Sequence, residues 1–149
     1  MLLPAFDAGL VNNKLTSIAG VRPITNITIT QAEEYARARG NGWHIMNMAA
    51  ESANQMLQIV EYGHMNGQQA IEQGITWAPN GSNIFFITGS TSSLGNTTGH
   101  AESTNVDINN TRTAMTEEGY RAISYRGMEN PWGNIWSMIG GTNINGNGI

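Results

Sequence analysis

Apolar residues recur at helical spacing most clearly between Asn47 and Tyr62. Five of them fall on one face of a helix, at Ala49, Ala53, Met56, Leu57 and Val60. The opposite face is polar and carries Glu51, Asn54, Gln58 and Glu61. Asn47 provides an N-cap side chain, and Gly63 provides a stop at the other end. The pattern predicts an amphipathic helix from Asn47 to about Tyr62.

Two further helices are indicated by their end signals. Thr30 and Glu33 have the spacing of a capping box, and the residues from Gln31 to Arg39 contain no helix breaker before Gly40. Asn66-Gly67 begins a short helical turn, Gln68 to Gln73, which Gly74 ends.

β-Branched and alternating segments predict the strands. The expected strands are Val21 to Thr30, a short strand-like piece from Trp43 to Met46, a β pair formed by Ile75 to Ala78 and Ile84 to Thr88, and Tyr120 to Tyr125. Two helices come early and β structure dominates the second half, which is an α+β order. We expect two early helices packed on one small, twisted antiparallel sheet with long polar loops.

The segment from Gly89 to Asn110 is low in complexity and polar, and we expect a long loop there. Four oxygen-bearing side chains make it a candidate ligand-binding region: Glu102, Asn105, Asp107 and Asn109. Ca²⁺ favours such ligands, although the spacing is not that of an EF-hand. The alternative is a loop whose polar groups are only solvated.

The sequence divides into an N-terminal arm, residues 1–19, and one domain, residues 20–149. The arm from Met1 to Ala19 has no helical or strand period. It carries several large apolar side chains, which are Leu2, Leu3, Phe6, Leu10 and Val11. We expect it to pack on another chain of a homo-oligomer, with a trimer as first choice; the alternative is that it folds over its own domain.

Composition narrows the class of protein. The chain has 149 residues, 12% charged residues, a net charge of -4 and no cysteine. Disulfide frameworks, thiol chemistry and Cys-based metal sites are therefore excluded. The acidic balance disfavours nucleic-acid binding. The first ten residues lack the basic region of a signal peptide, and no apolar run approaches a membrane span.

Candidate catalytic residues are sparse. The three histidines are His44, His64 and His100, and Glu61 with His64 forms one Glu-x-x-His pair, whereas a di-iron bundle needs two. We expect His64 to serve at a helix C-terminus. The sequence contains no nucleophile elbow, P-loop or GxGxxG motif. These observations predict a protein that is not an enzyme and that needs no cofactor or metal.

The densest motif is RGMENPWGNIW, from Arg126 to Trp136. Pro131 fixes a turn, Gly133 allows a positive φ, and the Asn134 amide can connect two loop backbones. We expect a buried structural brace made of Trp43, Arg126, Trp132, Asn134 and Trp136. The alternative is that exposed Trp rings form a ligand platform.

This motif resembles the GNVW-type signature of the C-type-lectin-like fold, in the branch of formylglycine-generating enzymes and of diversity-generating-retroelement variable proteins. It is most similar to a YRG-x-EN-x-WGNIW stretch of bacteriophage tail-fibre and other virion proteins, in which a helix with a QxLxxVEYG-like pattern comes earlier. Gln55 to Gly63 matches that helix, and the resemblance covers roughly Pro23 to Ile144.

The resemblance implies a non-catalytic virion protein, such as a tail-fibre, spike or particle-surface component, that binds a host-surface receptor or glycan. The alternatives are a structural or decoration subunit for capsid or tail assembly and a retroelement variable protein. Enzymes of the branch use cysteines or a His-rich iron site, which this chain lacks. Virion relatives continue well past the WGNIW stretch, which implies either a minimal domain or one that a partner chain completes.

Overall fold

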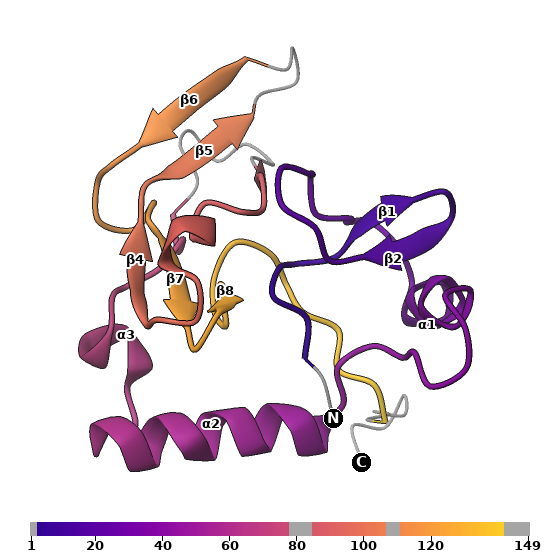
Figure 1. Cartoon of the computed structure of the whole chain (residues 1–149), viewed down its shortest axis with the longest axis horizontal. Helices are drawn as coiled ribbons and strands as arrows, with labels where there is room; N and C mark the ends of the chain where they lie inside the picture. The colour runs from indigo at the N-terminus through magenta and orange to yellow at the C-terminus, as the bar shows by residue number, and fades with distance from the viewer. Residues whose placement is uncertain (1–2, 78–84, 107–110, 142–149) are drawn as a thin grey trace, which may run out of the picture.

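The computed structural model describes residues 3–77, 85–106 and 111–141 and shows an α+β protein (Figure 1). The helices are α1 (Ile29–Arg37), α2 (Met48–Tyr62), α3 (Gly67–Ala70) and the 3₁₀ turn η2 (Ser92–Leu94). The strands are β1 (Gly9–Val11), β2 (Lys14–Thr16), β3 (Phe85–Phe86), β4 (Gly99–Ala101), β5 (Ser103–Val106), β6 (Arg112–Met115), β7 (Ala122–Tyr125) and β8 (Met128–Glu129). The predicted α+β class is confirmed.

In the described ranges the strands pair in antiparallel fashion and form three small sheets, β1-β2, β3-β5-β6 and β4-β7-β8. The expectation of one sheet is therefore wrong for the described residues. Strand β7 lies between β4 and β8, and all four of its residues are buried. A small core joins Ile75, Phe86, Tyr120 and Ala122. None of the helices in the described ranges is both long and apolar enough to cross a membrane.

Helix α2 has the predicted bounds and caps. Asn47 Oδ1 accepts a hydrogen bond from the Ala50 amide at 2.9 Å, and Gly63 adopts the left-handed conformation at φ 62°. Helix α1 begins two residues before the predicted start. Its cap is Thr28, which exchanges hydrogen bonds with Gln31 at 3.2 and 2.9 Å. The sequence contains two possible capping boxes, Thr28 with Gln31 and Thr30 with Glu33, and the structure forms the first of them.

Several strand predictions are wrong. The segments 21–28 and 43–46 form neither strand nor helix. Ile75 and Thr76 are not in a strand; instead the Thr76 and Trp77 amides both donate to the Gly119 carbonyl. Strand β3 pairs with β5, so the expected loop from 89 to 110 contains η2 and two strands. Residues 78–84, which include the predicted turn, lie outside the described residues. Strand β7 confirms the predicted strand from Tyr120 to Tyr125.

The arm is bonded to its own domain. The Ala5 carbonyl accepts from the Glu129 amide at 2.7 Å, and the Ala8 carbonyl accepts from the Ile24 amide at 2.9 Å. Strands β1 and β2 form a hairpin beside α1 (Figure 1). For residues 3–19 the structure thus shows the alternative arrangement, in which the arm folds over its own domain.

Helix α2 lies along one edge of the molecule (Figure 1). Its buried residues are Ala50 and Asn54, whereas its predicted apolar face is largely in solvent. Val60 is 84% exposed and Met56 is 60% exposed. An amphipathic helix ordinarily buries its apolar stripe. In α2 the polar face is turned inward instead.

Candidate functional site

Polar side chains gather beside β7 and β8. Asn134 is hydrogen-bonded to Asp7, the charge of Glu129 acts on Asp7, and the side chain of Asn130 accepts from the Ile123 amide of β7. We call Asp7, Glu129, Asn130 and Asn134 the central polar cluster.

Glu129 is buried and accepts three hydrogen bonds, from the Gly89 amide and from the amide and hydroxyl of Thr91, at 2.7 to 2.8 Å. Such charge-assisted bonds compensate for the burial of the carboxylate. The cluster therefore holds the loop before η2 against β8.

Asn134 connects three segments of the chain, as its short amide predicted. Its side chain accepts from the Phe86 amide at 3.2 Å and donates to the Asp7 carboxylate at 3.0 Å. Its own amide donates to the Ile75 carbonyl at 2.8 Å. Asn134 and Asn130 both have positive φ, at 61° and 48°, which Asn tolerates better than most residues. The two asparagines fix the turn around Pro131.

The pKa of Asp7 is raised to about 6, chiefly by burial; the hydrogen bond from Asn134 lowers it and the negative charge of Glu129 raises it. The Asp7 carboxyl group is thus close to half-protonated near pH 6. The charge of Asp7, which accepts a hydrogen bond from Asn134, therefore changes near pH 6.

The Trp132 side chain packs against α3 and lines a cavity that α2 also borders. The indole lies against two glycines, and a Cβ added to Gly67 or Gly74 would come within 2.7 or 3.0 Å of the ring. The indole Nε1 is buried and has no hydrogen-bond partner among the residues that the structure describes. Trp132 is thus half-buried against glycine backbone, whereas Trp43 and Trp136, the other two rings of the predicted brace, are exposed.

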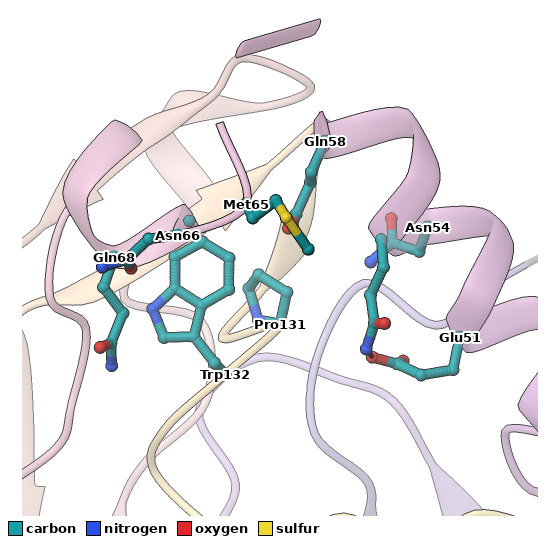
Figure 2. A pocket seen from close by; sticks show the side chains of 10 residues that line it. Glu51, Asn54, Gln58, Met65, Asn66, Gln68, Pro131 and Trp132 are labelled. Atoms are coloured by element: carbon teal, nitrogen blue, oxygen red, sulfur yellow. Dashed lines mark hydrogen bonds between the residues drawn. The ribbon is translucent and has the colours of Figure 1, made fainter. Parts of the chain in front are cut away.

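A cavity of about 470 Å³ opens between Trp132 and α2 (Figure 2). Trp132 and Gln68 stand on one side, Asn54 and Glu51 on the other, and Pro131 lies between them (Figure 2). The lining residues are Glu51, Asn54, Gln55, Gln58, Met65, Asn66, Gly67, Gln68, Pro131 and Trp132. The volume is within the range of small-molecule sites, about 300–1,000 Å³.

Amide groups dominate the polar lining of this cavity. Asn54 is only 8% exposed, yet its carboxamide and that of Gln58 make no hydrogen bond to any described residue. Glu51, the one charged residue in the lining, accepts a hydrogen bond from Gln55 at 2.9 Å. The Asn54 and Gln58 amides can each donate and accept, so the cavity presents unused hydrogen-bonding groups beside an aromatic ring.

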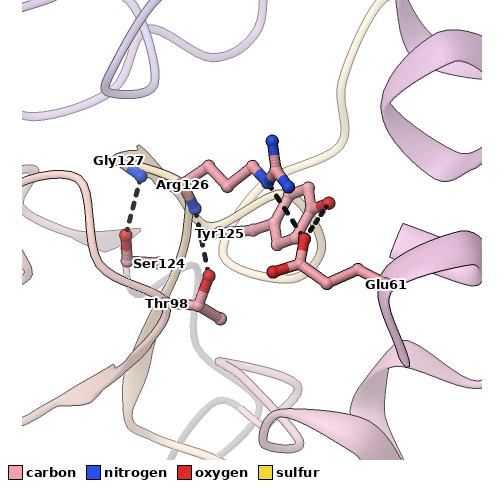
Figure 3. Close-up of polar contacts among 6 residues, drawn as sticks. All are labelled: Glu61, Thr98, Ser124, Tyr125, Arg126 and Gly127. Carbon is pink, nitrogen blue, oxygen red and sulfur yellow. Dashed lines mark hydrogen bonds and ion pairs between the residues drawn. The ribbon is translucent and has the colours of Figure 1, made fainter. Parts of the chain in front are cut away.

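A second polar group joins the end of α2 to β7 (Figure 3). One carboxylate oxygen of Glu61 accepts from the Tyr125 hydroxyl at 2.8 Å and from Arg126 Nε at 2.9 Å. The hydrogen bonds from Tyr125 and then from Arg126 hold the pKa of Glu61 below its ordinary value, whereas burial raises the pKa of Tyr125. A wider hollow of about 600 Å³ borders Glu61, Arg126 and Thr98.

The histidines do not gather with these acids. His64 accepts from the Asn66 amide at 2.9 Å, while the carboxylate of Glu61 is bonded to other partners. His100 pairs with Glu72 at 3.1 Å, on a different element. Within the described part of the chain no three His, Asp or Glu side chains are grouped as metal ligands would be.

The predicted brace is wrong for three of its five members. Trp136 is 100% exposed, Trp43 is 53% exposed and lies under the Arg39 guanidinium, and Arg126 is exposed with its Glu61 pair. Trp132 and Asn134 are half-buried. The chain turns outward after Asn134, so a Trp two residues later points into solvent.

The predicted ligand loop is only partly described. Glu102 is exposed between β4 and β5, and Asn105 lies in β5 opposite Phe86 and Thr113. Asp107 and Asn109 lie outside the described residues. The Ca²⁺ hypothesis for this loop stays a prediction.

Sequence reasoning missed Asp7, Glu129 and Asn54 as functional candidates. Asp7 lies in a segment without period, and Glu129 looks like an ordinary surface acid inside the motif. Asn54 lies on the polar face of α2, and a polar helix face ordinarily lies in water, so the sequence offered no reason to expect a buried site there.

This chain matches no protein-family model, and no curated protein or solved structure is significantly similar to it. The lectin-like resemblance of the motif therefore rests on the residues themselves.

Proposed function

We propose that the protein is a non-catalytic component of a bacteriophage particle and that it binds a neutral glycan of the host surface in the cavity beside Trp132. The observation that carries this proposal is the lining of the cavity, in which unbonded amides face an indole. Sugar hydroxyls both donate and accept hydrogen bonds, as amides do, and the C–H face of a sugar ring packs on aromatic rings.

The charge of the lining supports a neutral ligand. Glu51 is the only ionisable residue in it, and no cationic side chain is present to bind an acidic sugar or a phosphate. Such a site is specific for ligands that pair with its amides, because a ligand without matching hydroxyl groups leaves those amides buried and unpaired.

The resemblance to virion proteins supports the particle assignment as an analogy at the level of the family. It extends to a C-type-lectin-like fold, a location in the virion and binding without catalysis. The genomic neighbourhood tests it. We expect genes for tail or capsid proteins beside this one, and a neighbourhood without virion genes contradicts the assignment. A cluster of adenine-mutable codons beyond the WGNIW segment would favour the retroelement alternative instead.

Glycan binding is tested by NMR titration of the full chain with methyl glycosides of neutral hexoses and N-acetylhexosamines. We expect shifts of the Trp132 indole and Asn54 side-chain signals. Replacing Gln58→Ala removes one free amide and should weaken binding about fivefold, which is the effect of one hydrogen bond. Gln69→Ala is the matched control, because Gln69 is exposed and is not part of the lining. Equal loss in both variants, or no shift with any sugar, refutes the glycan site.

A second candidate is a structural or decoration subunit that acts through assembly in a homo-oligomer. The observation that favours it is the set of apolar side chains that α2 exposes. Cryo-electron microscopy of particles tests this role, because a decoration subunit appears at stoichiometric lattice positions and a receptor binder appears at fibre or spike tips.

A further inference from the structure

Helix α2 carries an apolar stripe, Ala49, Ala53, Met56 and Val60, of which Ala53 is half-buried and the other three are exposed; we call it the α2 stripe. Its members are four, three and four residues apart, which is the spacing of a seam that a second helix can cover. Leu57 and Ile59 flank it and are 49% and 39% exposed. Two large apolar side chains of the stripe, Met56 and Val60, are 60% and 84% exposed on the same helix face, so the stripe offers apolar area that a partner can cover.

The stripe is uncharged as well as apolar. Both acids of α2 are used on its other side, Glu51 with Gln55 and Glu61 with Tyr125 and Arg126. Two copies of the stripe can therefore meet without like charges facing each other, even though the chain has a net charge of -4. The stripe has no charged side chain that could pair with a strongly charged partner.

The sizes of the side chains select an antiparallel copy. The stripe is small in its first half, at Ala49 and Ala53, and large in its second half, at Met56 and Val60. When two α2 helices lie antiparallel, Val60 faces Ala49 of the other copy and Met56 faces Ala53. Large side chains then fill the space above small ones, whereas a parallel pair sets large against large and small against small.

We propose that the α2 stripe binds the α2 stripe of a second copy of this chain in an antiparallel, two-fold symmetric dimer. This surface differs from the N-terminal arm, which is bonded to its own domain. A two-fold axis makes the contact self-complementary and closed.

The area indicates a reversible dimer. A helix of this length is about 22 Å long and about 10 Å wide, so α2 alone presents roughly 200 Å², against about 800 Å² per partner in a stable interface. We therefore expect association at high micromolar concentration.

Sedimentation equilibrium of the full chain tests the dimer. We expect the mass to rise from 16.1 kDa toward twice that value between about 10 and 500 µM, the range of a weak interface. Val60→Glu should weaken association at least tenfold, while Gln69→Glu, which adds the same charge off the stripe, should not. Circular dichroism shows whether each variant is folded. A chain that stays monomeric at 500 µM, or loses association equally in both variants, overturns the proposal.

Cysteine cross-linking tests the orientation, because the chain has no native cysteine. Under oxidation, a mixture of Ala49→Cys and Val60→Cys chains should form disulfide dimers, since facing residues bring Cβ atoms to about 4 Å. Val60→Cys alone should cross-link at least fivefold more slowly. Faster cross-linking of Val60→Cys with itself indicates a parallel pair, and equal slow rates in all samples indicate no specific pair; either result overturns the antiparallel dimer.

Discussion

The segment from Arg126 to Asn134 and helix α2 treat polar and apolar side chains in opposite ways. In the segment, Glu129 and Asn130 are buried and Asn134 is bonded on three sides. In α2, Met56 and Val60 are exposed while Asn54 is buried. Polar groups thus fill the interior of one region and the inner face of the other.

The two regions differ in the hydrogen-bond partners that are available to their buried polar groups. Glu129 and Asn134 meet backbone amides and carbonyls of distant segments, so their burial is compensated. Asn54 meets only the cavity. Buried polar groups in the segment stabilise the fold, whereas the same type of group in α2 remains available to a ligand.

The largest expected effect on stability comes from replacing a glycine with alanine, and the same replacement can be made in both regions. Gly133→Ala places a Cβ 2.5 Å from the Ile75 carbonyl oxygen at φ 83°, whereas Gly63→Ala, at the end of α2, meets nothing within 4 Å at φ 62°. We expect Gly133→Ala to lower the free energy of unfolding by about 3–5 kcal/mol and Gly63→Ala by about 1 kcal/mol. Urea unfolding measures both. Similar losses would mean that the segment is no tighter than the helix end.

The second prediction compares the two tryptophans of the motif, which differ in burial. Trp132 packs against Gly67 and Gly74, whereas Trp136 is 100% exposed. Trp132→Ala should lower the free energy of unfolding by about 2–4 kcal/mol, and Trp136→Ala by less than about 0.5 kcal/mol. Thermal unfolding followed by circular dichroism distinguishes them. A large effect at Trp136 would show that the ring is buried against something else.

The pH dependence tests the central polar cluster. Burial raises the pKa of Asp7 from 3.8 to about 6, so the folded chain holds this proton more tightly than the unfolded chain does. The free energy of unfolding from this group must fall as pH rises from about 4 to about 6, and stay level above that. Asp7→Asn removes the charge and should raise stability at pH 7 by about 1–3 kcal/mol.

The control for Asp7→Asn is Glu102→Gln, which neutralises an exposed acid. The difference between Asp7→Asn and the parent should vanish near pH 4, where the parent's carboxyl group is protonated in the folded state. Parallel stability curves for Asp7→Asn and its parent from pH 4 to 7 would contradict the raised pKa.

Local signals predicted the helices well because capping depends on residues three positions apart. Asn47 and Gly63 set the ends of α2, and strand β7 followed from its alternating residues. The positive φ of Gly133 and the bridging role of Asn134 also followed from residue type.

Long-range partners decided what the sequence could not predict. The inward face of α2 depends on Tyr125 and Arg126, which lie more than sixty positions after Glu61 and bond to it. The depth of Asp7 depends on Asn134, 127 positions away. Aromatic residues were assumed to lie in the core, but Trp43 and Trp136 are in solvent, because burial depends on where the chain turns and not on side-chain type alone.

The smallest predicted effect has an unusual sign. In most helices Val→Ala removes buried area and lowers stability, but Val60 is 84% exposed and has little burial to lose. Val also has a lower helix propensity than Ala, because its branched side chain loses freedom against the preceding turn. We therefore expect Val60→Ala to raise the free energy of unfolding by about 0.5 kcal/mol when measured at low micromolar concentration, where the chain is monomeric. If Val60→Ala destabilises the dilute protein by 1 kcal/mol or more, Val60 is buried within a single chain, and the inversion of polar and apolar faces that sets α2 apart is incorrect.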